Sequence, residues 1–222
     1  MFKNILIVED LDSIVNGIKG LLKQNTEIDS IITAQYCDEA YLKFLKSLQV
    51  NDPFDLLITD LSFKADHREL SIATGEDLIA AIRLKSKNVK IIAYSVEDRP
   101  FKVKQLFEKY TINGYVVKGR NGLNNMSHAI DEIYKGNTYV SPEITAALSL
   151  KEVFEVDDYD VSLLLHLSKG LTQDQISHFF KNEKISPNSI SSIEKRLNRL
   201  KLQLQAKTTI QLVANAKDMG LI

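Results

Sequence analysis

Five polar side chains that suit one piece of chemistry lie in the first 118 residues, and each follows a short apolar run. Glu9 and Asp10 follow the run ILIV, and Asp60 follows LLIT. Ser95 follows IIAY, and Lys118 follows YVV. Because ligands bind outside the carboxyl ends of the strands in a parallel sheet, we expect these three carboxylates, one hydroxyl and one ammonium to converge on one edge.

These groups suit a hard divalent cation together with a phosphoryl group. Mg²⁺ prefers oxygen ligands in near-octahedral geometry and keeps several waters, so a carboxylate pair with a third carboxylate on a neighbouring strand fits it. The third carboxylate, Asp60, can also attack a phosphoryl donor as a nucleophile. The metal and the Lys118 ammonium can neutralise the charge on the transferring oxygens, and the Ser95 hydroxyl can hydrogen-bond the product phosphoryl group.

The runs before these residues are predicted strands of one α/β domain. Short apolar runs alternate with stretches of helical spacing, which predicts a parallel sheet covered by helices on both faces. The predicted strands are residues 3–8, 30–35, 54–59, 89–94 and 112–117, and the predicted helices include 75–86 and 121–135. The expected fold is a five-stranded, doubly wound parallel sheet.

The chain changes character after residue 137, where strand-like runs disappear. Residues 160–222 have a wholly helical pattern. Thr172-x-x-Gln175 resembles a capping box, and Ser186-Pro187 opens a long helix. A short helix that turns into a longer one in a small bundle allows a helix-turn-helix.

The length of 222 residues allows two small domains. We predict a first domain over residues 1–137, a linker over 138–156 and a small all-α domain over 157–222. The net charge of -1 gives no overall signal for nucleic acid, although a local basic face is compatible with it.

Two features of composition favour a cytoplasmic protein without a membrane partner. The single Cys37 rules out an internal disulfide and fits a reducing compartment. The apolar run in MFKNILIVED is too short for a signal peptide, and no uninterrupted apolar run approaches the roughly 20 residues that a membrane helix needs.

The first domain resembles the receiver domain of two-component response regulators, on four motifs that occur in order. These motifs are VED ending at Asp10, ITD ending at Asp60, AYS ending at Ser95 and GYVVKG containing Lys118. Taken singly, each motif residue could be a helix cap, a turn residue, a surface charge or part of the core. The order of all four motifs at predicted strand ends favours the receiver.

The resemblance implies a flavodoxin-like fold and a role for each motif residue. Asp60 would be the phosphoacceptor, Ser95 and Tyr115 the switch pair, and Lys118 the lysine that contacts the phosphoryl group. The implied Mg²⁺ ligands are Glu9, Asp10, Asp60 and the backbone carbonyl of Ser62.

Two positions depart from the receiver pattern. The proline that usually follows the phosphoacceptor is absent from Leu61-Ser62-Phe63-Lys64, and the matching glycine, Gly75, comes several residues late. The loop over the site is therefore longer than usual. Val96 stands where alanine or glycine is usual after the switch hydroxyl, so its branched side chain could narrow access to the phosphoryl group.

The helical end resembles the LuxR-type helix-turn-helix of NarL/FixJ response regulators. The likeness rests on Gly170-Leu171-Thr172, on residues 185–190 (ISPNSI) and on the last residues, 219–222. From Asp160 onward there are nine Lys or Arg and five Asp or Glu, which suits phosphate contacts. The implied DNA contacts are Asn188, Ser191, Ser192, Lys195, Arg196 and Arg199.

Together these expectations describe a transcriptional response regulator that is not itself an enzyme. A sensor histidine kinase would phosphorylate Asp60, and phosphorylation would control dimerisation and binding to double-stranded DNA. The helix predicted over residues 207–217 is the candidate homodimer surface.

Three alternatives stay open at this point. The helical domain could bind protein instead of DNA, or the regulator could work without phosphorylation. Asp10-Leu11-Asp12 also fits the start of a haloacid-dehalogenase-type phosphatase, whose later acid pair would have to be Asp157-Asp158. That last reading leaves Asp60 without a role.

Overall fold

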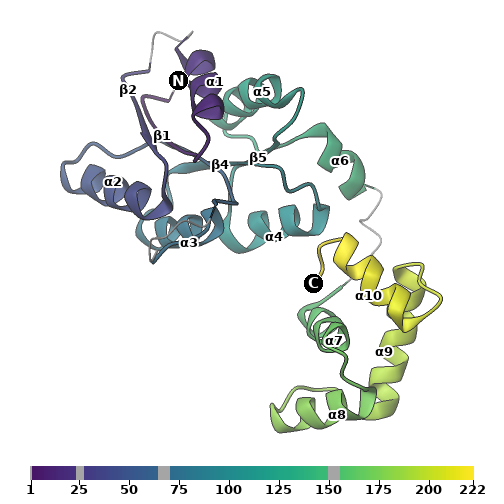
Figure 1. Cartoon of the computed structure of the whole chain (residues 1–222). Coiled ribbons are helices and arrows are strands. Elements are labelled where there is room, and N and C mark those ends of the chain that lie inside the picture. The colour runs from purple at the N-terminus through teal and green to yellow at the C-terminus, as the bar shows by residue number, and fades with distance from the viewer. Residues whose placement is uncertain (1, 24–27, 65–70, 150–155) are drawn as a thin grey trace. The chain divides into compact units, whose positions relative to one another are not determined.

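The computed structural model describes residues 2–23, 28–64, 71–149 and 156–222 (Figure 1). The chain divides into two compact units. The N-terminal unit contains residues up to Asp98 together with Val103–Thr145, and the C-terminal unit contains Arg99–Lys102 and Ala146–Ile222. The predicted domain boundaries stay a prediction, and part of the predicted linker lies outside the described residues.

The N-terminal unit is a parallel sheet with strand order β2-β1-β3-β4-β5-β6. The strands are β1 Asn4–Val8, β2 Ser30–Ala34, β3 Leu56–Thr59, β4 Lys90–Ser95, β5 Gly114–Val117 and β6 Tyr139–Val140. The helices up to residue 149 are α1 Asp12–Leu22, α2 Cys37–Gln49, α3 Gly75–Lys85, α4 Pro100–Tyr110, α5 Gly122–Tyr134 and α6 Pro142–Ser149. The first residues of α4 and the end of α6 are assigned to the C-terminal unit.

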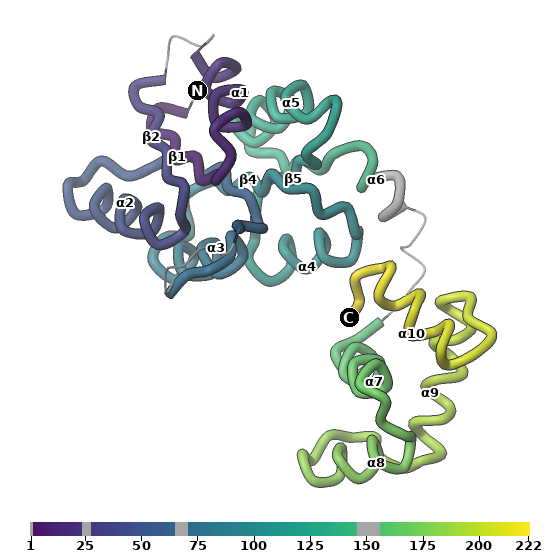
Figure 2. The backbone as a smooth tube through the Cα atoms, in the orientation of Figure 1, coloured from purple at the N-terminus to yellow at the C-terminus, as the bar shows by residue number. Residues whose placement is uncertain are grey.

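Helices cover both faces of this sheet, as the continuous apolar strands predict. All four residues of β3 and the last four of β1 are buried, so neither face of these strands meets water. Figures 1 and 2 show α1 and α5 side by side on one face, with α2, α3 and α4 on the other. Ile18 of α1 and Met126 of α5 join Ile7 and Ile58 of the sheet in one buried cluster.

The prediction of five strands was wrong by one short strand. β6 pairs in parallel with β5, and Tyr139 lies opposite Gly114. Ser141 extends this pairing, because its amide donates to the Tyr115 carbonyl at 3.0 Å and its hydroxyl accepts from Val117 N at 3.0 Å. Two residues are too few to show a strand period in the sequence, so the pairing with β5 alone defines this strand.

The described part of the C-terminal unit from residue 156 onward is a bundle of four helices. They are α7 Asp158–Ser168, α8 Gln173–Asn182, α9 Ile190–Gln203 and α10 Thr209–Asp218. The Thr172–Gln175 capping box is confirmed, since each side chain accepts from the other residue's amide. The bundle's core is Leu163, Leu164, Ile176, Phe180, Ile193, Leu197, Leu200, Leu204, Ala206, Leu212, Ala216 and Leu221.

Within the described ranges, no helix has both the length and the apolarity needed to cross a lipid bilayer.

Gly75 lets α3 begin in close contact with the backbone of Asp60 and Leu61, which directly follow β3. Its amide donates to the Leu61 carbonyl at 3.1 Å, and a Cβ built on it would lie 1.8 Å from the carbonyl oxygen of Asp60. That distance is impossible without moving the backbone, so the first residue of α3 must lack a side chain.

We expect Gly75→Ala to lower the free energy of unfolding by about 1–3 kcal/mol, because overpacking forces backbone shifts. Gly20→Ala is the matched control, because Gly20 is exposed on α1 and an added Cβ would meet nothing within 4 Å. Removing that helical glycine should raise stability by about 0.5–1 kcal/mol. Urea denaturation followed by circular dichroism measures both, and equal stability of the two variants would contradict the packing argument.

Candidate functional site

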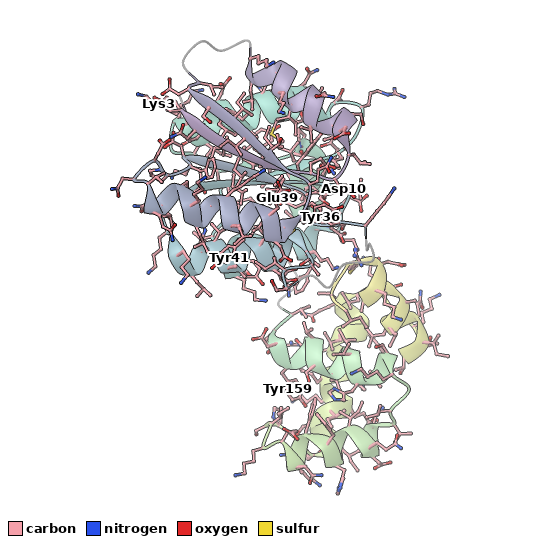
Figure 3. All side chains as sticks on the ribbon, turned by 60° about the vertical axis from the view of Figure 1, so that its left-hand side comes forward. Lys3, Asp10, Tyr36, Glu39, Tyr41 and Tyr159 are labelled. Atoms are coloured by element: carbon pink, nitrogen blue, oxygen red, sulfur yellow. The ribbon has the colours of Figure 1, made fainter. Side chains whose placement is uncertain are left out.

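The register of the sheet brings the predicted residues to one edge. Val8 lies opposite Thr59, and Ser95 lies opposite Val117, so neighbouring strands end at the same level. The residues that follow β1, β3 and β5 therefore meet above the carboxyl ends of the strands. Figure 3 labels Asp10 at this edge of the N-terminal unit.

Lys118 joins two of the carboxylates directly. Its Nζ lies 2.7 Å from Asp60 Oδ2 and 2.7 Å from Glu9 Oε2. Glu9 and Asp60 are buried, and the Lys118 side chain is only 9% exposed. Burial by itself lowers the pKa of Lys118, but hydrogen bonds and charge attraction from Asp60 and Glu9 outweigh burial and raise it. The lysine is therefore held as an ammonium against the predicted phosphoacceptor.

Glu9, Asp10 and Asp60 form an acidic cluster whose carboxylate oxygens lie within 4.8 Å of one another. Burial raises the pKa of Glu9 above its ordinary value, although Lys118 acts in the opposite direction. Three carboxylates around one point, two of them buried, are a donor set that fits a hard divalent cation such as Mg²⁺.

Backbone amides of the β3–α3 segment orient the same carboxylates. Asp60 Oδ1 accepts from Leu61 N at 2.6 Å and from Ser62 N at 3.3 Å. Asp10 Oδ2 accepts from Lys64 N at 3.3 Å. Residues 65–70 of the predicted long loop lie outside the described residues. The described start of the loop thus reaches two of the three acids.

Ser95 and Tyr115 lie on neighbouring strands beside this cluster. Both side chains are fully buried. The Tyr115 hydroxyl donates to the Glu97 carbonyl at 2.6 Å, and Ser95 Oγ accepts from Glu97 N at 3.4 Å. Burial raises the pKa of Tyr115, which keeps its phenol neutral. Their role as a switch pair stays a prediction. Val96, which the sequence predicts to narrow access to the phosphoryl group, is 68% exposed.

Tyr94 is a site residue to which the sequence pattern assigns no role. Its buried ring lies 5.6 Å from Lys118 Nζ, within the range of a cation–π contact. Gly122 makes room for it, because a Cβ there would lie 2.5 Å from the Tyr94 hydroxyl. An aromatic residue directly before Ser95 was the available signal, but only the tertiary structure places its ring against the lysine.

The helix-turn-helix prediction corresponds to α8 and α9, whose connecting turn is held by side chains. Ser177 Oγ donates to the Asn188 carbonyl at 2.6 Å, and Asn188 Nδ2 donates to the Ile185 carbonyl at 2.9 Å. Ser189 caps α9 by accepting from Ser192 N at 3.2 Å. The turn residues thus have structural partners within the unit.

Two of the predicted DNA contacts point toward α7. Asp160 is completely buried, and its carboxylate accepts from Arg196 Nε and, at 2.9 Å, from Arg199 Nη2. Arg196 also pairs with Asp157, the N-cap of α7, and its guanidinium lies 5.5 Å from the ring of Tyr159, which Figure 3 labels on α7. Ser191 and Lys195 are exposed on α9.

Comparisons with known proteins identify relatives of this chain. Response regulator GacA of Pseudomonas aeruginosa is 26% identical over 157 residues, which cover 70% of this chain and 66% of that protein. GacA of Pseudomonas viridiflava is 26% identical over 148 residues, 66% of this chain and 62% of that protein. The chain thus spans a little under two thirds of the length of these relatives. A family of unknown function, DUF5932, matches residues 128–219.

Solved structures match the fold over almost the whole chain. The response regulator RcsB of Salmonella typhimurium, in a structure concerned with its DNA interaction, has a TM-score of 0.68 at 20% identity and covers 97% of this chain and 99% of that one. RcsB of Salmonella enterica serovar Typhimurium, bound to a promoter with the phosphomimetic BeF3-, has a TM-score of 0.63 at 19% identity, covering 96% and 97%. The chain is therefore similar in sequence to response regulators and has the fold of these RcsB structures. Its α/β elements come before its helical elements along the chain.

We expect Glu9→Gln to stabilise the metal-free protein at pH 7. Because the folded pKa of Glu9 is raised above its ordinary value of 4.5, folding favours the protonated acid, and that stability is lost as the pH rises through the raised pKa. Glutamine mimics the protonated acid, so its advantage should grow as the pH rises from 4.5 toward the raised pKa and should vanish below pH 4.5.

Urea midpoints between pH 4 and pH 8 measure this difference, with the exposed Glu108→Gln as a control that should change little. Mg²⁺ should stabilise the unmodified protein more than Glu9→Gln, because the variant has one carboxylate fewer. A variant less stable than the parent at pH 7 without Mg²⁺ would contradict the electrostatic argument.

Proposed function

We propose that this protein is a response regulator that accepts a phosphoryl group on Asp60 and controls transcription by binding DNA through α8 and α9. The observation that carries the proposal is the buried contact of Lys118 with Asp60 and Glu9 at the edge of a parallel sheet. An acid held between an ammonium, two backbone amides and two further carboxylates is placed for phosphoryl transfer.

Each residue has a definite part in the proposed transfer. An Asp60 carboxylate oxygen forms the new bond to phosphorus, while the bond from phosphorus to the donor, a phosphohistidine of a sensor kinase, breaks and the imidazole leaves with the electron pair. The Lys118 ammonium faces the phosphoryl oxygens, and Ser95 offers its hydroxyl to the product. When bound by Glu9, Asp10, Asp60 and the Ser62 carbonyl, Mg²⁺ would add positive charge against those oxygens.

The partners follow from the same proposal. A sensor histidine kinase supplies the phosphoryl group, in the cytoplasm. Phosphorylation pairs two copies, so that two helix-turn-helix units address two half-sites of double-stranded DNA. An exposed apolar side chain supports the proposal that α10 forms the dimer surface. Ile210 on α10 is 84% exposed, and burying it against a second copy would remove apolar surface from water.

The phosphatase alternative finds little support in the described residues. Asp157 is the N-cap of α7 and pairs with Arg196, and Asp158 lies in the first turn of that helix. Asp157 therefore caps a helix of the bundle and pairs with an arginine there. The acid that lies beside Asp10 in the acidic cluster is Asp60, to which the phosphatase alternative gives no role.

We expect acetyl phosphate and Mg²⁺ to add one phosphoryl group to the intact protein, as measured by mass spectrometry. Asp60→Ala should gain none, and Lys118→Ala should gain it at least tenfold more slowly, because the charge on the transferring oxygens is no longer neutralised. Asp131→Asn removes an exposed acid of α5 and should behave like the parent.

A phosphorylated Asp60→Ala would refute the site assignment. An unmodified parent that still bound DNA would support the regulator that works without phosphorylation.

We expect the phosphorylated full chain to bind genomic DNA fragments more tightly than an inert control protein in an anisotropy titration. Its affinity should fall linearly with salt on logarithmic axes, because binding releases counterions from the phosphates. Lys195→Ala should weaken binding to all fragments and reduce the salt slope by about 1.

Lys135→Ala, which removes an exposed lysine at the end of α5, is the control and should leave the slope unchanged. Affinity no higher than that of the inert control would favour a helical unit that binds protein.

A further inference from the structure

The helix α9 has three distinct faces. Its buried face contains Ile193, Leu197 and Leu200. A second face presents Arg196 and Arg199 to the buried Asp160. The third face is exposed and carries Ser191, Glu194, Lys195, Asn198 and Leu202.

The exposed residues form one stripe along the helix. They follow the spacing i, i+3, i+4, i+7 and i+11, which places side chains on one side of a helix with 3.6 residues per turn. The stripe lies opposite the buried face, so it is the part of α9 that a major groove would receive. Arg196 and Arg199, which the sequence predicts as DNA contacts, lie on the flank of this stripe.

The polar residues of the stripe have chemistry suited to base edges. A carboxylate such as that of Glu194 is repelled by phosphates, but it can accept a hydrogen bond from the N4 amino group of cytosine. The amide of Asn198 can bond adenine at both N6 and N7. An acid on the outward face of a recognition helix lowers general affinity for DNA, and reading a base is a role that would offset this cost.

We propose that Glu194 and Asn198 are the specificity-determining residues of α9, with Glu194 reading a cytosine and Asn198 an adenine. This inference rests on the proposed DNA binding. Arg196 and Arg199 hold α9 against α7, and Lys195 adds attraction to phosphates.

The spacing of the two readers sets the spacing of the two bases. Glu194 and Asn198 are one helical turn apart, about 6 Å at a rise of 1.5 Å per residue. A helix in the major groove is inclined to the duplex axis, and residues about one turn apart contact neighbouring bases, so the cytosine and the adenine should lie one or two base-pair steps apart.

Selection of binding sites from a random duplex library by the phosphorylated full chain tests the proposal. The parent should enrich a motif with the two bases at that spacing. Glu194→Gln should exchange the cytosine for adenine at one position, because glutamine bonds adenine N6 and N7. Asn198→Ala should lose the adenine preference, and each preference should amount to roughly tenfold in affinity.

Two controls separate base reading from charge and from folding. Glu183→Gln removes the same charge from the exposed C-cap of α8 and should leave the motif unchanged. Arg199→Ala should lower the melting temperature without altering the motif, because it acts through Asp160.

Three results would overturn the inference. The motif of Glu194→Gln could equal that of the parent while both bind DNA, or Arg199→Ala could change the preferred bases. A parent that enriches no duplex would overturn the proposed DNA binding and this inference with it.

Discussion

The contact of one largely buried ammonium, that of Lys118, with two buried carboxylates is the interaction on which the candidate site depends. Asp60, Glu9 and Asp10 place their oxygens within 4.8 Å of one another, and like charges at that distance repel strongly where water is scarce. The Lys118 ammonium, 2.7 Å from both Asp60 and Glu9, offsets much of that repulsion. Burial nevertheless raises the pKa of Glu9, and the charge of Asp60 adds to that rise, although Lys118 acts in the opposite direction. Binding of a cation, or a change in charge at Asp60, therefore directly changes the stability of this carboxylate cluster at the carboxyl ends of the strands.

The surrounding elements are built to hold this edge in place. The fully buried strand β3 fixes the backbone before Asp60. Gly75 allows α3 to start against the Asp60 carbonyl, and Gly122 leaves space for the Tyr94 ring beside Lys118. Because these approaches are so close, a displacement at the site cannot be absorbed locally and must move neighbouring elements. This is the physical requirement for a switch in which a small chemical event changes a larger structure.

The C-terminal unit uses the same kind of interaction for a different purpose. Asp160 is completely buried, and Arg196 and Arg199 surround its carboxylate. Removing both arginines would leave the Asp160 carboxylate unpaired in the core, which is much more costly than losing an exposed pair. The pairing thus sets the rotation of α9 about its axis relative to α7. That rotation decides which side chains of α9 face outward, and so which ones the proposed DNA binding can use.

The sequence by itself determined the parts that depend on local pattern and on residue type. Apolar runs located five strands, the residues after them located the acids and the lysine, and Thr172 with Gln175 located the start of α8. Only the tertiary structure decided the features that depend on contacts between distant residues. β6 has two residues and exists through its pairing with β5, so no periodicity could predict it. The direction of Arg196 depends on Asp160, 36 positions away, and the role of Tyr94 depends on Lys118 on the neighbouring strand segment. Periodicity says which residues share a face, but packing decides what that face meets.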